Sequence, residues 1–191
     1  TALSSHEVAQ GYKDVKEISV FVRFKRKGME NAYFLAWTTT PWTLPSNVAL
    51  CVNAEEDYAE IETDGARYVL AQALVPSLFE EGTYTTLSVK KGSEYERCEY
   101  EPLFPYAEGS YREQAHYVVC DGYVTLTDGT GIVHIAPAFG EDDYRVGQKY
   151  GLPVVNMVDE RGCFKPAVTD FAGVFVKKAD KGIIALLKEK G

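Results

Sequence analysis

Hydroxyl side chains are concentrated in one short stretch of the sequence, AWTTTPWTLPSN (Ala36–Asn47). Five threonine or serine hydroxyls, two tryptophans and two prolines fall within twelve residues. Because a hydroxyl both donates and accepts hydrogen bonds, such a cluster can hold a water molecule or an ester group. The ordinary alternative is that the β-branched threonines favour a strand and that the Thr-Pro and Leu-Pro steps mark a turn.

A second stretch, DGTGIVHIAPAFGEDDY (Asp128–Tyr144), combines a histidine with a group of acids. Its Gly-Thr-Gly turn allows tight backbone curvature, the strand that follows contains His134, and Pro137 ends that strand. Gly140 then leads into a predicted helix. A loop, a strand and a helix start therefore converge here, and the first turn of that helix contains Glu141, Asp142 and Asp143.

Each feature of this second stretch also has a structural explanation. Acids in the first turn of a helix usually complement the helix dipole and cap free N–H groups. A lone histidine in a strand is more often structural than catalytic, and a Gly-Thr-Gly motif is common in hairpin turns. The sequence contains no GxxxxGK[ST] phosphate loop. Taken singly, these motifs are weak indications of a site.

Most of the chain shows strand patterns, in which branched and aromatic residues alternate between turn formers. ISVFVRF and AYFLAW predict a hairpin (18–24 and 32–37) that turns through KRKGMEN. In DYAEIETDGARYVLA (57–71), Asp64-Gly65 between two alternating runs is the strongest short-range signal for a hairpin. Two further strands are predicted in AHYVVCDGYVTL (115–126) and GIVHIAP (131–137).

Helical patterns are fewer than strand patterns. A short helix is predicted in QALVPSLFEE (72–81), interrupted early by a proline, and longer helices in EDDYRVGQKYG (141–151) and ADKGIIALLKEKG (179–191). The predicted fold class is α+β and β-rich: a mixed β-barrel or curved sheet with peripheral helices, rather than a doubly wound parallel sheet.

The length of 191 residues predicts a single domain over residues 1–191. The chain lacks an initiator methionine and ends directly after an amphipathic helix pattern. We therefore expect a piece of a longer polypeptide, with its junctions near residues 1–15 and 178–191. No run approaches the roughly 18 apolar residues that span a bilayer, and the N-terminus lacks the regions of a signal peptide.

The net charge of −8 argues against broad, sequence-independent binding of a nucleic-acid backbone. It leaves room for a pocket that binds one nucleotide end. The four cysteines are widely spaced without a CxxC pair, and the three histidines do not cluster beside them. We therefore expect neither a zinc site nor a disulfide framework, and we expect a reducing, cytoplasmic compartment.

Together, WTTTPWTLPSNVAL and GTGIVHIAPAFGEDDY resemble the two signature segments of the editing domain that is inserted into isoleucyl-tRNA synthetase. The resemblance extends from ALSSHEV to FAGVFVKKADKGIIALLKEKG, which is nearly the whole chain. Related domains of the valyl and leucyl enzymes would have an arginine where this chain has Thr40 and an acid where it has Trp42. Phe139 is a departure, because many bacterial relatives would have a second histidine there.

The resemblance implies a hydrolytic reaction. The substrate would be the ester that joins valine to the terminal adenosine of tRNA(Ile), or the valyl-adenylate. Asp143 matches the aspartate that binds the α-ammonium group of the amino acid in this family. Thr38, Thr39 and Thr40 would orient a water molecule and the developing oxyanion, so that Asp143, Thr39 and Thr40 form the catalytic group. Asn47 would support the loop or the substrate.

The resemblance also implies a size filter. Valine and isoleucine differ by one methylene, which is worth only about 1–3 kcal/mol in an apolar pocket. Isoleucyl-tRNA synthetase is the standard example of an enzyme whose selection between two amino acids is limited in this way. His134, Thr43 and Trp42 would form the wall that admits valine and excludes isoleucine. The two ATP-site signatures of the synthetase are absent. ATP and magnesium would therefore belong to a catalytic domain outside this chain, and this domain needs no cofactor or metal.

The expected partners are the 3′ end of aminoacylated tRNA(Ile), its valine moiety, and the rest of the synthetase in cis, with the chain itself a monomer that does not bind membranes. Two alternatives remain from the residues. One is a free-standing, trans-acting deacylase. The other is a nonenzymatic module that docks the end of a tRNA, which the acidic balance of charge disfavours.

Overall fold

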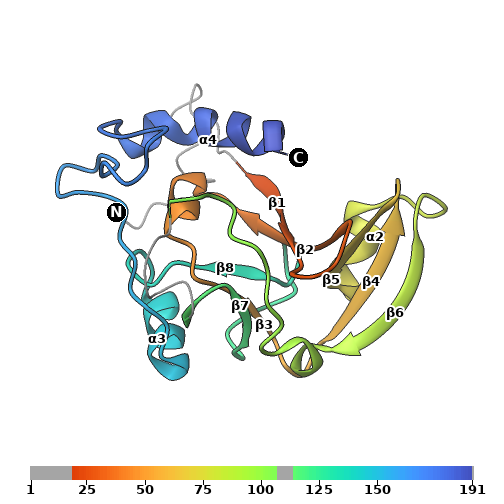
Figure 1. Cartoon of the computed structure of the whole chain (residues 1–191). Helices are drawn as coiled ribbons and strands as arrows, with labels where there is room; N and C mark the ends of the chain where they lie inside the picture. The colour runs from red at the N-terminus through yellow and green to blue at the C-terminus, as the bar shows by residue number, and fades with distance from the viewer. Residues whose placement is uncertain (1–18, 107–113, 191) are drawn as a thin grey trace, which may run out of the picture.

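The computed structural model describes residues 19–106 and 114–190, most of them arranged around two sheets (Figure 1). The strands in this range are β1 (Val20–Lys25), β2 (Ala32–Thr38), β3 (Ala49–Val52), β4 (Asp57–Thr63), β5 (Ala66–Ala71), β6 (Thr85–Lys91), β7 (Tyr117–Cys120) and β8 (Val133–Ile135). The helical segments are η1 (Pro41–Ser46), η2 (Gln72–Leu74), α2 (Val75–Leu78), η3 (Gly92–Tyr95), α3 (Glu141–Tyr150) and α4 (Val176–Lys190).

The larger sheet has five strands in the order β1-β2-β5-β4-β6. β1 and β2 form an antiparallel hairpin in which Val20 lies opposite Thr38. β4 and β5 form a second hairpin, and its turn residues Asp64 and Gly65 have φ angles of 50° and 78°, as a two-residue turn of this kind requires. β2 runs parallel to β5, so β2 is paired on both sides and Thr38 is the last residue of an interior strand.

The smaller sheet has three short strands in the order β7-β3-β8. β3 lies in the centre, parallel to β7 and antiparallel to β8. All four residues of β3 are buried, as expected for a strand covered on both faces. The register places Leu50 opposite His134, so the central strand fixes the position of this histidine.

One apolar core joins the two sheets. Phe24 and Phe34 of the larger sheet belong to the same buried cluster as Leu50 and Ile135 of the smaller sheet. The connection 39–48 runs from β2 to β3 and contains η1, which packs against α4. In Figure 1, α4 lies across the top of the view, above β1 and β2. The hydroxyl-rich stretch is therefore held between two sheets and a helix.

The predicted α+β, β-rich fold class is confirmed: the structure has two mixed sheets with few helices. Within the described residues neither sheet closes into a barrel, so the curved-sheet form of the prediction is the one observed. The two predicted hairpins and the helix at 141–151 are present. The helix predicted at 72–81 is a 3₁₀ turn followed by a single α-helical turn.

Two details of the prediction were wrong. The strand predicted over 115–126 ends at Cys120, because the side chain of Asp121 accepts a hydrogen bond from the N–H of Tyr123 and turns the backbone. β3 and β6 were not predicted. The junction expected at residues 1–15 lies outside the described residues. Over the described part of the chain, no helix is both long and apolar enough to cross a bilayer.

Candidate functional site

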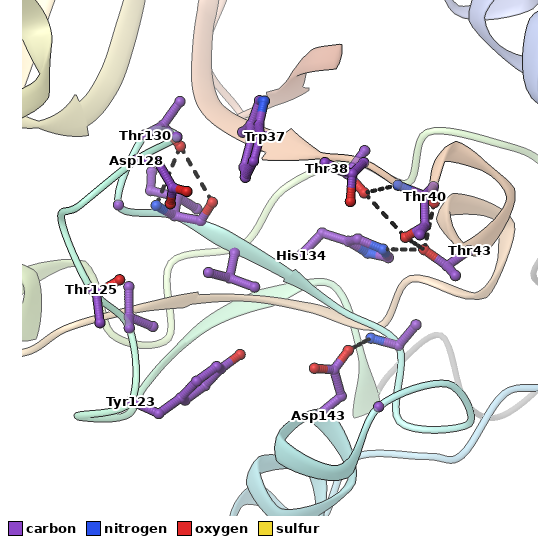
Figure 2. A pocket seen from close by; sticks show the side chains of 18 of the residues that line it. Trp37, Thr38, Thr40, Thr43, Tyr123, Thr125, Asp128, Thr130, His134 and Asp143 are labelled. Carbon is purple, nitrogen blue, oxygen red and sulfur yellow. Dashed lines mark hydrogen bonds between the residues drawn. The ribbon is translucent and has the colours of Figure 1, made fainter. Parts of the chain in front are cut away.

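A cavity of about 340 Å³ opens between the end of β2, η1, β8, the 123–131 loop and the start of α3 (Figure 2). This volume falls within the range of small-molecule sites. Trp42 and Asn47 contact the lining from outside: Trp42 packs edge-on against Phe139, and Asn47 contacts His134. The other predicted site residues line the cavity; they are Thr38, Thr39, Thr40, Thr43, His134 and Asp143.

Three of the threonines form a chain of hydroxyls. The Oγ1 atoms of Thr38 and Thr40 are 3.4 Å apart, and those of Thr40 and Thr43 are 3.3 Å apart. The backbone N–H of Thr40 donates to Thr38 Oγ1 at 3.1 Å, and Pro41, whose φ angle is fixed, starts η1 directly afterwards. Thr39 lines the cavity between them. This local backbone turns a strand end into a polar wall.

His134 is buried at the end of this chain. Its Nε2 lies 2.7 Å from Thr43 Oγ1, and its Nδ1 lies 3.0 Å from Asn47 Nδ2. On the far side of Asn47, the hydroxyl of Tyr100 donates to Asn47 Oδ1. Burial lowers the pKa of His134 to about 4. The imidazole is therefore neutral at pH 7, and it presents a rigid, uncharged surface to the cavity.

Asp143 and Asp142 are neighbours in sequence with different surroundings. The carboxylate of Asp143 points into the cavity, and its Oδ2 accepts the backbone N–H of Ala136 at 2.9 Å (Figure 2). Burial raises the pKa of Asp143. Asp142 has a side chain that is 59% exposed and forms an ion pair with Arg145 at 3.5 Å. Of these two acids, only Asp143 is therefore placed to meet a ligand in the cavity, which Asp128 also lines.

Gly140 explains how Asp143 reaches the cavity. A Cβ atom at residue 140 would lie 3.0 Å from Asp143 Oδ1, which is closer than side chains normally approach. The glycine therefore lets the start of α3 close over the carboxylate. Gly140 precedes the helix and provides no side-chain cap, and the three acids of the first turn complement the positive end of the helix dipole.

Several lining residues were not predicted as site residues. The Gly-Thr-Gly turn was noted in the sequence, and it forms one wall: Gly129 has a φ of 69°, and a Cβ there would lie 3.0 Å from a ring carbon of Trp37. Trp37 and Tyr123 also line the cavity. Trp37 lies within the hydroxyl-rich stretch, whereas no sequence signal marked Tyr123. Among the described residues, no group of three or more histidines, cysteines or acids could hold a metal ion.

Curated isoleucine–tRNA ligases align with this chain over its whole length. The ligase of Clostridium novyi is 56% identical over 191 residues, and that of Picrophilus torridus is 51% identical over 189 residues. The chain belongs to the isoleucine–tRNA ligase family. It spans about 18% of the length of these ligases, so it corresponds to one segment of them. No family model matches the chain.

Solved structures identify the fold of this isoleucine–tRNA ligase segment. The crystal structure of GlLeuRS-CP1 matches with a TM-score of 0.70 and 16% identity over 91% of this chain and 96% of that chain. The editing domain of the P. falciparum cytosolic leucyl-tRNA synthetase matches with a TM-score of 0.56 and 16% identity, covering 98% of this chain and 86% of that chain. The segment is therefore the editing-domain region of an isoleucine–tRNA ligase.

Proposed function

We propose that this domain hydrolyses the ester between valine and the terminal adenosine of tRNA(Ile), as the proofreading site of a ligase that joins isoleucine to this tRNA. One observation supports the proposal most: the carboxylate of Asp143 and a chain of threonine hydroxyls face the same cavity from different elements. An aminoacyl ester presents an ammonium group beside a reactive carbonyl, and these two kinds of protein group match that pair.

Asp143 binds the α-ammonium group in this proposal. A charge-assisted hydrogen bond from the ammonium to a half-buried carboxylate is stronger than a neutral one. Since Ala136 donates to Oδ2, the carboxylate is held in one orientation, and its remaining lone pairs can accept from the substrate. The fixed ammonium then places the neighbouring carbonyl against the threonines, which is the positioning that speeds a hydrolysis.

The threonines act on the water and the carbonyl. Thr38 and Thr40 hold the attacking water with their side-chain oxygens. Thr39 stands outside the hydroxyl chain, so its proton is available for the oxyanion that develops on the carbonyl. An activated ester needs less assistance than an amide, and the ribose hydroxyl of the substrate itself can relay a proton.

Selection between amino acids falls to the wall formed by His134 and Thr43. Their bond of 2.7 Å and the burial of the histidine keep the wall in one place. Trp42 acts from behind, because it packs against the Phe139 ring that lines the cavity. A rigid wall admits the side chain of valine and collides with the additional methylene of isoleucine.

The reaction proposed here uses no cofactor or metal in this domain. Carboxylate, hydroxyl and amide groups supply the binding and the polarisation. ATP and magnesium serve the ligation reaction, in the parts of the ligase outside this segment. The partners are the 3′ end of the charged tRNA and the rest of the ligase, and the site of action is the cytoplasm.

The deciding experiment compares deacylation of valyl-tRNA(Ile) and isoleucyl-tRNA(Ile) by this chain and by the full-length ligase. We expect hydrolysis of the valyl ester, sparing of the isoleucyl ester, and unchanged rates in EDTA. Equal rates on the two esters would contradict the size filter, and loss of activity in EDTA would reveal a metal. Binding of charged tRNA without hydrolysis, by the chain and by the ligase alike, would support the docking alternative instead.

A further inference from the structure

We propose that Asn47 fixes the tautomer of His134 and, through it, the direction of every hydroxyl proton in the threonine chain, so that Thr38 and Thr40 offer lone pairs and no protons to the cavity. The bonding pattern stands on the structure alone, and its use in catalysis rests on the proposed function. Asn47 is thereby a positioning residue that acts through His134.

The first fixed point is the carbonyl oxygen of Ala49. It lies 2.9 Å from Asn47 Nδ2, and because a carbonyl can only accept, the amide nitrogen of Asn47 must face it. The other side of the amide agrees. Burial raises the pKa of the Tyr100 hydroxyl well above 10, so this group keeps its proton and donates it to Asn47 Oδ1. The amide is thus held in one orientation from two sides.

The orientation of the amide decides the tautomer of the histidine. Asn47 Nδ2 also lies 3.0 Å from His134 Nδ1, and since it is a donor, Nδ1 must accept. An imidazole that is neutral and accepts at Nδ1 has its proton on Nε2. His134 Nε2 therefore donates to Thr43 Oγ1 over 2.7 Å.

The second fixed point is the carbonyl oxygen of Thr40, which accepts the proton of Thr43 Oγ1 at 2.9 Å. Thr43 has no further proton for Thr40 Oγ1 at 3.3 Å, so Thr40 must be the donor of that bond. The single proton of Thr40 is then used. Thr38 must accordingly donate to Thr40 Oγ1 at 3.4 Å, while it accepts the backbone N–H of Thr40.

The remaining capacity of each hydroxyl follows from two lone pairs and one proton per oxygen. Thr43 Oγ1 accepts from His134 and from Thr40 and donates once, so it is complete. Thr38 and Thr40 each accept once and donate once, which leaves one lone pair on each oxygen. A water molecule that donates one hydrogen to this pair of oxygens keeps a lone pair for the substrate carbonyl and a second hydrogen for the ribose hydroxyl, which passes a proton to the leaving oxygen as the ester bond breaks. That is the orientation in which water attacks.

The tautomer can be tested without any substrate. In a chain labelled with ¹⁵N-histidine at neutral pH, we expect His134 to show a protonated Nε2 and a bare Nδ1 in long-range ¹H–¹⁵N spectra. The His134→Gln variant identifies its signals among those of His6 and His116. A protonated Nδ1, alone or in an imidazolium, would overturn the proposal.

Asn47→Asp tests the direction of the chain. Because a carboxylate can only accept, His134 must then have a proton on Nδ1. The direction in which each threonine hydroxyl donates is then no longer fixed. We expect the histidine signals to change accordingly and kcat on valyl-tRNA(Ile) to fall roughly 10-fold or more, with a smaller change in KM. Retention of the bare Nδ1, or of kcat in a folded variant with a protonated Nδ1, would contradict the proposal.

Asn53→Asp is the matched control. Asn53 also donates to a carbonyl, that of Val124 at 3.1 Å, but it has no histidine beside its amide in the described structure. We expect this variant to keep the tautomer of His134. Circular dichroism checks that both variants fold. If Asn47→Asp does not fold, the ¹H–¹⁵N spectrum of the unaltered chain still tests the tautomer of His134. If Nδ1 is bare but neither the chain nor the ligase hydrolyses valyl-tRNA, the proposed function alone is refuted. If Nδ1 is protonated in an active chain, only the proposed role of Asn47 and His134 is refuted.

Discussion

The two sheets bury different kinds of groups. The interior of the larger sheet is apolar, with Phe24, Phe34, Ile61 and Leu70 fully or almost fully inaccessible. Among the described residues, the buried polar side chains other than tyrosines lie almost entirely elsewhere, and the single one in this sheet is Thr38, the last residue of β2. The others surround the smaller sheet, η1 and α4; they are Thr43, Ser46, Asn47, His116, Asp121, Thr130, His134 and Asp180.

This difference separates the region whose burial stabilises the fold from the region where burial of polar groups costs free energy. Burying apolar side chains in the larger sheet is favourable in proportion to area. A buried polar group, by contrast, costs free energy unless every bond is made, and the Asn47–His134–Thr43 chain makes them at the cavity wall. We therefore expect substitutions in the larger sheet to change stability, and those around the smaller sheet to change chemistry.

The largest expected effect is on stability, in the larger sheet. Phe34→Ala should lower the free energy of unfolding by about 3–5 kcal/mol, because it removes a fully buried ring and leaves a cavity. Urea denaturation measures this loss. Under conditions where the variant is folded, its ratio of valyl- to isoleucyl-tRNA hydrolysis should equal that of the unaltered chain. A changed ratio would show that the two regions are not separable.

The next effect concerns the carboxylate in the cavity. Asp143→Ala should slow hydrolysis of valyl-tRNA(Ile) by roughly 100-fold or more, since the ester loses its anchor and is misplaced. Asp142→Ala is the control, because this exposed acid pairs with Arg145 outside the cavity. Single-turnover rates distinguish the two variants. If Asp142→Ala is impaired and Asp143→Ala is not, the ammonium is held by the neighbour.

The wall should control selectivity more than rate. His134→Ala or Thr43→Ala opens space beside the amino-acid side chain, so isoleucyl-tRNA(Ile) should now be hydrolysed. The change in the valyl-to-isoleucyl ratio should correspond to about 1–3 kcal/mol, which is the scale of one methylene in a pocket. Parallel deacylation assays on both esters provide the measurement. Two variants that still spare the isoleucyl ester would place the wall elsewhere.

The smallest effect is a dependence of stability on pH. The pKa of His134 falls from 6.5 to about 4 on folding, so between these values the unfolded chain binds more protons. The free energy of unfolding therefore falls as the pH is lowered. Between about pH 7 and about pH 5.5, His134 contributes a loss of about 1 kcal/mol. Urea unfolding of the unaltered chain and of His134→Gln isolates this contribution, and identical slopes would contradict it.

Local turn chemistry explains why much of the larger sheet could be predicted. Asp64 and Gly65 specify a turn by themselves, and the alternating runs on either side need no distant information. β3 has no such signal: ALCV is short, apolar on both faces and paired with strands far away in sequence. β6 is almost entirely exposed, so its sequence shows no buried face.

The site could be predicted only in part, because some of its contacts join residues that are far apart in the sequence. The family resemblance selected Asp143 over Asp142, and the structure gives a physical difference between them in the contacts of each carboxylate. The bond between Asn47 and His134 joins residues 87 positions apart, and Tyr100 approaches from a third segment. Such contacts depend on how β3 aligns with β8. No periodicity of a single stretch contains that information.

The connection 39–48 begins on an interior strand of one sheet and ends on the central strand of the other. Its length is therefore set by the gap that it bridges. An insertion or deletion there would have to shift one sheet against the other, and the cavity with them. The hairpin tip at Asp64 and Gly65 is exposed and is anchored by its own two strands alone. Added sequence, such as a tag or a label, belongs at that tip, where chain length is free to vary.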